Sequence, residues 1–274
     1  MDPEVIRSRQ NPRVKELRRL ATRKGRWGAR LFLAEGPETV REALKAQIAL
    51  SLFVNVEKQD EYRDLLAEAD RSDVETLFLA PSLYDYISTT ATPPGVLAIC
   101  PFLHDSRDGL LAGQLDLVVL AVRPRDPGNL GTLIRTAAAA GVDGMVISGQ
   151  SVDLYNPKVV RATMGGMFLL PLALDSNAGT VLESAKKAGL TLVGSVPRGG
   201  EDLFSADLSG RALLVLGGEV EGLPTDTRLL CDRLVSIPMS RQTDSLNLAT
   251  AGAILIYEAM RQRAALPSER AASS

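Results

Sequence analysis

The stretch IPMSRQTDSLNLATAGAILIYEAMRQR, residues 237–263, carries more structural information than any other part of the chain. Pro238 cannot donate a hydrogen bond inside a sheet, so the apolar strand that reaches it ends there and a polar loop follows. The residues after this loop, 246–263, predict a helix that is apolar on nearly every side. Such a helix must pack against more than one neighbour.

The polar loop offers hydroxyls, an amide and both charges directly before the Ser-x-Asn pair Ser245 and Asn247. A loop of this kind at a helix start predicts a site for a small charged ligand. The plainer alternative is that Asp244 or Ser245 is the N-cap of the helix and that Asn247 is an ordinary first-turn residue. This segment alone leaves both interpretations open.

Composition narrows the class of protein. A chain of 274 residues with 45% hydrophobic residues has room for one or two domains with sizeable cores. Its longest apolar runs, at 115–122 and 212–218, are much shorter than the roughly 20 residues that cross a bilayer, and its start lacks an apolar signal core. Cys100 and Cys231 are too few for a disulfide framework. We therefore expect a cytoplasmic protein without a membrane partner.

Positive charge is concentrated at the N-terminus, although the formal net charge is only -2. Residues 1–30 hold ten Arg and Lys against three acids, with Val14, Leu17 and Leu20 on another face at helical spacing and Trp27 as a candidate base-stacking group. The segment suits contacts with nucleic-acid phosphates, whereas the alternative is a solvated basic helix. The candidate RNA-binding residues are Arg7, Arg9, Arg13, Lys15, Arg18, Arg19 and Lys24.

Alternating strand and helix signals divide the chain into two α/β units. In the first, residues 1–101 with a basic N-terminal arm, we expect strands at 31–35, 51–56, 74–79 and 95–100 and helices at 37–48, 60–70 and 82–88. Residues 102–114 lack a strong hydrophobic periodicity of either helix or strand and indicate a linker. In the second, residues 115–264, we expect strands at 115–122, 143–148, 167–173, 190–196, 212–217 and 233–238 and helices at 130–140, 156–163, 177–188, 225–231 and 246–263. Residues 265–274 are expected to form a flexible tail.

The alternation in the second unit predicts a parallel sheet with helices on both faces, whose ligands bind beyond the carboxyl ends of the strands. Three loops there connect a strand to a helix, at 123–129, 217–222 and 239–245. In the first loop, Asn129 is expected to cap the next helix, which carries Arg135. In the second, glycines let the backbone approach a ligand, and Glu219 is a candidate partner for Arg135.

Several familiar sites are disfavoured. The chain has no G-x-G-x-x-G after the first strand of the second unit and no P-loop motif, which argues against an ordinary dinucleotide or P-loop site. Its single histidine, His104, argues against a His-based triad or a His-rich metal site, and we expect no metal. Arg135 remains either a ligand for a phosphate or hydroxyl or an exposed arginine paired with a nearby acid.

Three segments, taken together, resemble the motifs of the SpoU (TrmH) RNA ribose 2'-O-methyltransferases of the SPOUT superfamily, in the family's order. They are DPGNLGTLIRTA at 126–137, LVLGGEVEGL at 214–223, and IPM with SLNLATAGAILIYEA at 237–259. The resemblance implies a parallel-sheet SPOUT domain with a deep trefoil knot, S-adenosylmethionine as methyl donor, and a homodimer formed through the knotted domain. Periodicity could not have predicted a knot, because true knots are nearly absent from known folds.

The same resemblance assigns roles to individual residues. It places the methyl donor against backbone groups of Gly217, Ile237 and Leu246, with Leu216, Gly218 and Met239 close by. Backbone donors and acceptors at glycine-rich turns can read an adenine edge and a ribose. It gives catalytic positions to Arg135, Asn129, Glu219, Ser245 and Asn247. One departure is that Leu248 and Ala249 stand where the family often has Val-Ser, which removes a hydroxyl but no charge.

Residues 8–17 and 32–44 resemble the L30e-like substrate-binding domain that many ribosomal-RNA members of the family carry. This implies a structured RNA substrate, and 23S ribosomal RNA in preference to transfer RNA. The alternatives are a tRNA 2'-O-methyltransferase, a methyltransferase or nucleotide enzyme acting on a base or small molecule, and a non-catalytic RNA-binding or ribosome-assembly factor. A role in antibiotic resistance is left open.

The family's chemistry implies in-line transfer of a methyl group from a sulfonium to a ribose 2'-hydroxyl, without a metal. Family proposals give Arg135 a base-like role, but a guanidinium with a pKa above about 12 keeps its proton. We therefore hypothesise that Arg135 holds an RNA phosphate and the hydroxyl, which makes the hydroxyl more acidic, while phosphate or water takes the proton.

Overall fold

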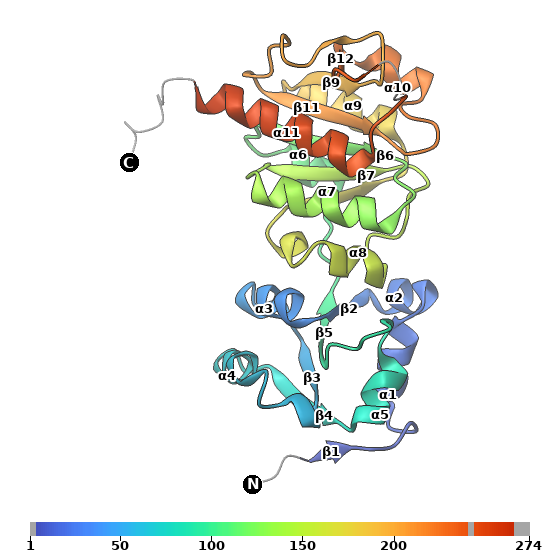
Figure 1. Ribbon diagram of the computed structural model, residues 1–274, viewed down its shortest axis with the longest axis vertical. Coiled ribbons are helices and arrows are strands. Elements are labelled where there is room, and N and C mark those ends of the chain that lie inside the picture. The colour runs from blue at the N-terminus through green and yellow to red at the C-terminus, as the bar shows by residue number, and fades with distance from the viewer. Residues whose placement is uncertain (1–3, 241–243, 266–274) are drawn as a thin grey trace. The chain divides into compact units, whose positions relative to one another are not determined.

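The computed structural model describes residues 4–240 and 244–265 and separates into two compact units (Figure 1). The first unit contains the residues up to Leu103 together with Asp153–Leu169. The second contains His104–Val152 and the residues from Leu170 onward. The chain therefore returns to the first unit from within the range expected for the second. The expected tail, 265–274, lies outside the described residues except for Ala265.

The first unit is built on a mixed sheet that has five strands in the described chain, in the order β1-β4-β3-β5-β2. β1, β4 and β3 pair in parallel, whereas β5 is antiparallel to both of its neighbours. The strands are β1 (Val5–Ile6), β2 (Leu31–Glu35), β3 (Ser51–Asn55), β4 (Glu75–Leu79) and β5 (Val96–Pro101). The helical segments are α1 (Pro12–Leu20), α2 (Arg23–Ala29), α3 (Pro37–Lys45), η1 (Val56–Lys58), α4 (Arg63–Arg71), α5 (Pro81–Ile87), α8 (Pro157–Ala162) and η2 (Gly166–Phe168).

The basic N-terminal segment forms the two helices α1 and α2 and packs on this sheet instead of extending as an arm. Asn11 caps α1 by accepting a hydrogen bond from the Arg13 N–H at 2.9 Å, and Pro12 occupies the first helical position. The apolar face expected from the spacing, Val14, Leu17 and Leu20, is fully buried in the core of this unit. Burial of that face leaves the charged face of α1 toward solvent.

Asp153 fixes the returning segment to the first unit. Its carboxylate pairs with Arg26 of α2, Nη2 to Oδ2 at 2.5 Å, and both side chains are almost completely buried. The indole N–H of Trp27 donates to the other carboxylate oxygen at 3.1 Å, and Arg26 also donates to the carbonyl oxygens of Leu20 and Ala21. Removing one partner of such a buried pair costs about 3–5 kcal/mol, so the network holds α8 in place. Trp27 has a structural contact here that the base-stacking interpretation did not anticipate.

The second unit contains an entirely parallel sheet with seven strands among the described residues, in the order β10-β12-β9-β11-β6-β7-β8. The strands are β6 (Leu117–Val122), β7 (Gly144–Ser148), β8 (Leu172–Asp175), β9 (Thr191–Ser195), β10 (Glu201–Asp202), β11 (Ala212–Gly217) and β12 (Arg233–Ser236). The helices are α6 (Arg107–Leu111), α7 (Pro127–Ala139), α9 (Ala178–Lys187), α10 (Thr225–Leu230) and α11 (Leu248–Ala264). The α/β fold with a parallel sheet is thereby confirmed. The trefoil knot stays a prediction.

Helices cover both faces of this sheet. Residues of α6 and α9 join a core with alternate residues of β6 and β7, such as Leu120 and Val146. On the other face α11 lies beside α7 (Figure 1). The approach is close because residue 252 is glycine: a Cβ there would come within 2.3 Å of Leu133 Cδ1 on α7. None of the helices that the structure describes is long and apolar enough to span a membrane.

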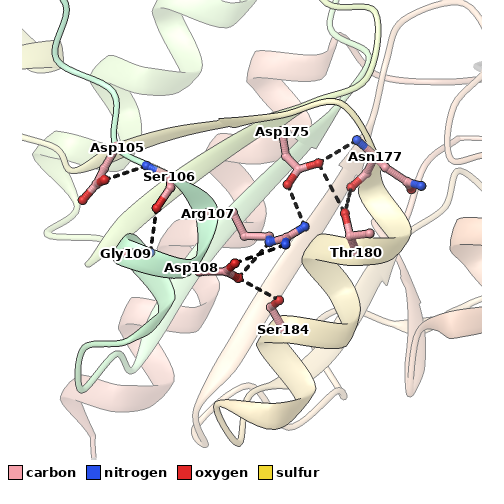
Figure 2. A network of polar contacts seen from close by, with 9 residues as sticks. All are labelled: Asp105, Ser106, Arg107, Asp108, Gly109, Asp175, Asn177, Thr180 and Ser184. Atoms are coloured by element: carbon pink, nitrogen blue, oxygen red, sulfur yellow. Dashed lines mark hydrogen bonds and ion pairs between the residues drawn. The ribbon is translucent and has the colours of Figure 1, made fainter.

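Two details of the second unit differ from the expectations. The linker range 102–114 contains α6, which is tied to the neighbouring elements (Figure 2): Arg107 donates to Asp175 at the end of β8 at 2.8 Å, and Ser184 of α9 donates to Asp108 at 3.2 Å. The strand expected at 167–173 begins only at Leu172, because Gly166–Phe168 forms the 3₁₀ helix η2. A continuous apolar run does not by itself distinguish a strand from a buried helical turn.

Candidate active site

A cavity of about 350 Å³ opens at the carboxyl ends of β9, β11 and β12, within the range of roughly 300–1,000 Å³ usual for small-molecule sites. All six residues expected to hold the methyl donor line it: Leu216, Gly217, Gly218, Ile237, Met239 and Leu246. Glu219 and Ser245 line it as well. The structure thus gathers the second and third loops around one space.

Glycines give the second loop its close turn. Gly222 adopts a positive φ of 62° and its N–H donates to the Gly218 carbonyl oxygen at 3.0 Å. A Cβ at position 217 would lie 2.1 Å from the carbonyl carbon of Gly222, and one at position 218 would lie 2.4 Å from the Arg123 carbonyl oxygen. Larger residues would force the backbone apart, so both glycines are required for the wall of the cavity.

Glu219 connects the second loop to the first. Its Oε2 accepts a hydrogen bond from the Arg125 N–H at 2.9 Å. Its Oε1 accepts from the Asp126 N–H at 3.3 Å and from Asn129 Nδ2 at 2.8 Å. Every neighbour of the carboxylate in this set is a donor, so the ionised form fits the arrangement.

The electrostatic result is a lowered pKa for Glu219. Burial acts in the opposite direction and alone would raise the pKa, because it penalises the charged carboxylate. The hydrogen bonds from Asn129 and from the Arg125 and Asp126 backbone outweigh it and hold the pKa of Glu219 below its ordinary value. Glu219 is therefore a fixed anion at neutral pH, which suits an anchor for two loops better than a proton acceptor.

Asn129 extends the connection to the third loop. Its Oδ1 accepts from Asn247 Nδ2 at 2.7 Å, while Asn247 Oδ1 accepts from the N–H groups of Ala249 and Thr250 at the start of α11. The amides of Asn129 and Asn247 therefore join α7 to α11 and, through Glu219, to the second loop. Neither amide belongs to the lining of the cavity.

The two helix caps differ from those expected. Asp126 is the N-cap of α7 and accepts from the Asn129 N–H at 2.8 Å, so Asn129 is a first-turn residue. Asn247 is the N-cap of α11, not Asp244 or Ser245. In both cases a neighbouring polar residue of similar capping preference competes, and sequence preference alone does not rank them. Because Asp126 is the cap, the Asn129 side chain is left to contact Glu219 and Asn247.

Arg135 lies apart from this network. It is exposed on α7, outside the cavity lining, and within the described chain it forms no hydrogen bond or ion pair. The expected pairing with Glu219 is wrong, because other donors surround that carboxylate. The alternative of an arginine paired with a nearby acid is not found either. Its guanidinium is available to a ligand from outside.

The cavity also has walls that the sequence did not reveal. Ser195, Val196 and Pro197 line it from the end of β9, and Arg228 lines it from α10. β9 lies between β11 and β12 in the sheet, so the carboxyl ends of all three strands meet there. The sequence could not predict these walls, because the segment after β9 has no motif of its own and its position depends on the strand order. Residues 241–243 of the third loop lie outside the described residues.

The seven basic residues expected to bind RNA are all exposed in the first unit. Arg9 and Arg18 place their guanidinium carbons 4.2 and 4.6 Å from the centroid of the Tyr86 ring. Arg18 also donates to the Tyr86 carbonyl oxygen at 2.9 Å. Arg13 differs because it pairs with Glu75 at 2.6 Å. Sequence reasoning missed Tyr86, which lies far from the basic segment along the chain.

No group of three or more His, Cys, Asp or Glu side chains within the described ranges could hold a metal ion.

Comparison with known proteins gives a consistent picture. Two family models match the chain: the SpoU rRNA Methylase family over residues 116–257 and the MRM3-like substrate binding domain over residues 11–98. The 23S rRNA (uridine(2479)-2'-O)-methyltransferase of Streptomyces viridochromogenes is 38% identical over an alignment that covers 69% of this chain and 68% of its own length. The 23S rRNA (guanosine(2553)-2'-O)-methyltransferase of Bacillus subtilis is 31% identical over 92% of this chain and 97% of its own.

A solved structure agrees with the sequence comparisons over nearly the whole chain. The AdoMet-bound rRNA methyltransferase from Sinorhizobium meliloti superposes with a TM-score of 0.84 at 31% identity, covering 97% of this chain and 100% of its own. A match over 97% of the chain covers residues of both units. The chain belongs to the SpoU rRNA methylase family and carries an MRM3-like substrate-binding domain.

Proposed function

We propose that this protein transfers a methyl group from S-adenosylmethionine to a ribose 2'-hydroxyl of 23S ribosomal RNA. The observation that carries the proposal is the chain of contacts from Glu219 through Asn129 to Asn247, which joins all three loops beside the cavity. The named relatives that match most of the chain modify 23S rRNA at a ribose 2'-oxygen. This favours ribosomal RNA over the transfer-RNA alternative.

The cavity fits the methyl donor by its chemistry. Leu216, Ile237 and Met239 supply apolar walls, while the backbone at Gly217 and Gly218 can approach an adenine or ribose closely. When bound, S-adenosylmethionine supplies a methyl group on an already activated sulfonium. The protein's own task is then to orient the two reactants and to favour loss of the hydroxyl proton.

We assign Arg135 to the binding of the RNA that accepts the methyl group. It is a permanently charged donor in a fixed planar fork and cannot remove a proton itself at neutral pH. A guanidinium that contacts both an RNA phosphate and the 2'-hydroxyl would stabilise the developing oxyanion. The proton passes to phosphate or water.

Replacing Arg135 by lysine should therefore fail nearly as badly as replacing it by alanine. An ammonium keeps the charge but cannot make two parallel hydrogen bonds, and loss of a transition-state donor costs about 100- to 1,000-fold in kcat. Single-turnover methyl transfer at saturating RNA measures the effect, with donor binding as a control for folding. Near-normal turnover of Arg135→Lys would show that charge alone suffices.

Glu219 should act as a structural anion and not as a general base. Because its pKa is lowered, its stabilising contribution is complete above the ordinary value of about 4.3 and is lost only as the pH falls through the lower folded value. Titration of Glu219 should therefore cause no change in the affinity for S-adenosylmethionine between about pH 5 and 8.

Glu219→Gln should weaken donor binding about tenfold throughout that pH range, because an amide NH₂ must face one of the three donors. Calorimetric titration with S-adenosylmethionine measures this, and Glu183→Gln on the exposed face of α9 is the matched control. A titration step near neutral pH that disappears in Glu219→Gln would instead identify Glu219 as a proton acceptor.

The RNA interface is proposed to include the basic surface around Tyr86. Stacking on this ring holds both Arg9 and Arg18 in place, which reduces the freedom that they would lose on binding phosphates. The first unit matches a substrate-binding domain, so RNA is the partner this surface suits.

Tyr86→Ala should weaken RNA binding about three- to tenfold while leaving the salt dependence of binding nearly unchanged, because all cations remain. Arg9→Ala should lower that salt dependence by about one phosphate contact. Filter binding at several salt concentrations measures both, and Tyr86→Phe, which keeps the ring, is the control. Equal binding by the Ala and Phe variants would remove Tyr86 from the interface.

A homodimer formed through the second unit is also part of the proposal. Tyr257 on α11 is 50% exposed, with Ile254 one turn earlier only partly buried, and this helix packs against α7. A second copy packed on this apolar surface would cover it. Sedimentation at micromolar concentration tests the dimer, and a monomer would refute it. A cytoplasmic location, where ribosomal RNA is modified, completes the proposal.

The direct test of the function is transfer of a tritiated methyl group from S-adenosylmethionine to unmodified total RNA. A 2'-O-methyl group blocks alkaline cleavage at its own linkage, so we expect label in an alkali-resistant dinucleotide from 23S rRNA. Label in transfer RNA would show that the substrate is transfer RNA and not 23S rRNA. Failure to bind S-adenosylmethionine would favour a non-catalytic RNA-binding protein.

A further inference from the structure

A second cavity, of about 420 Å³, lies in the second unit at the carboxyl ends of β6 and β7. Its walls are mainly polar and differ from those of the donor cavity. They come from the ends of two strands, from the start of α9 and from α10. The lining includes Arg123, Ser148, Gly149, Asn177, Gly179 and Asp226.

Ser148 is the feature without a structural explanation. Its side chain is completely buried, and its hydroxyl has no hydrogen-bond partner within the described chain. Ser148 follows Val146 by two residues on β7, so its side chain lies on the same face of the sheet as Val146, which packs in the core formed with α9. That is the face on which α9 borders the cavity. A buried hydroxyl without a partner is costly unless something else satisfies it.

The N-terminus of α9 faces the same space. Asn177 caps the helix by accepting from the Gly179 N–H at 2.8 Å, and both residues line the cavity. Figure 2 shows the contacts of this turn, in which the Asn177 N–H and the Thr180 hydroxyl both donate to Asp175. Asp175 in turn pairs with Arg107 and does not line the cavity. A helix start is a favourable position for an anion.

Arg123 supplies the positive charge. Its backbone lies in the left-handed region at φ 53°, an uncommon conformation for a residue with a side chain. The stem passes over Gly149, where a Cβ would lie 2.8 Å from Arg123 Cγ, so the glycine makes room for it. The guanidinium pairs with Glu221 at 3.0 Å, but both side chains are largely exposed and the pair can be shared with a ligand. Asp226 is the carboxylate that lines the cavity, and its Oδ1 is engaged by Thr227.

We infer that this cavity binds a phosphate group, separately from the donor site and independently of the proposed methyl transfer. The Arg123 guanidinium and the Ser148 hydroxyl are the donors that line it, from the ends of β6 and β7, and the start of α9 adds its favourable dipole. A tetrahedral phosphate presents oxygens in all of these directions, whereas a carboxylate presents two in one plane. The phosphate can be free or can belong to RNA.

The test is a titration of the full-length protein with inorganic phosphate, followed by calorimetry and by the thermal unfolding midpoint. We expect saturable binding, and a Kd about tenfold weaker for Ser148→Ala, because one hydrogen bond to a charged ligand is lost. Without phosphate, Ser148→Ala should unfold at the same temperature as the wild type or higher, since it removes an unsatisfied buried hydroxyl. Ser184→Ala, on the same helix but outside the cavity, should bind phosphate normally.

A second pair of variants tests whether the positive charge of Arg123 contributes to phosphate binding. Arg123→Gln should also weaken phosphate binding, whereas Lys187→Gln, at the opposite end of α9, should not. The inference is overturned if the wild type responds to phosphate only as it does to chloride of equal ionic strength. It is also overturned if Ser148→Ala binds phosphate as tightly as the wild type.

Competition with RNA identifies the source of the phosphate. If inorganic phosphate and RNA exclude each other in the wild type but not in Ser148→Ala, the cavity takes a phosphate of the RNA chain. If phosphate binds without affecting RNA, it takes a free phosphate or a small phosphorylated molecule. Both results support the phosphate site.

Discussion

The hydrogen bond between the side chains of Asn129 and Asn247 is the contact on which the arrangement of the site depends. These residues are far apart in the chain and open two different helices, α7 and α11. Through Glu219 the same connection reaches the second loop. Glu219 in the second loop, Asn129 at the end of the first and Asn247 after the third are therefore joined by side-chain hydrogen bonds. Charge-assisted contacts to Glu219 make the connection stronger than neutral amide contacts alone would.

The parallel sheet explains why such a connection is available. All of its strands place their carboxyl ends at one edge, so loops from distant parts of the sequence meet there. Glycines at positions 217 and 218 then allow the second loop to pass against the backbone of its neighbours. The cavity is thus walled by apolar side chains and by closely packed backbone, while the guanidinium of Arg135 is exposed outside it.

Sequence patterns predicted most of the strands and helices because the two differ in period and length, whereas a short apolar run such as 167–173 left them undistinguished. The residues predicted to hold the methyl donor line one cavity, since they lie at or after the ends of strands that meet at one edge, and their role in binding stays a prediction. Failures came where several polar residues compete for one role, as with Asp126 and Asn129 as N-cap, and where partners are remote, as with Glu219 and Arg135. The return of Asp153–Leu169 to the first unit is stabilised by contacts between residues remote in the chain, such as the ion pairs of Asp153 with Arg26 and of Arg161 with Glu35, which no local pattern marks.

A double-mutant cycle on Asn129 and Asn247 tests the central claim most directly. Asn247→Ser keeps an N-cap for α11 but is too short to reach Asn129, and Asn129→Ala removes the bridge from the other side. If the bridge is what both side chains contribute, the double variant should lose no more catalytic efficiency, kcat/KM, than the more damaging single variant. Losses that multiply would show that the two residues act independently and would contradict the account.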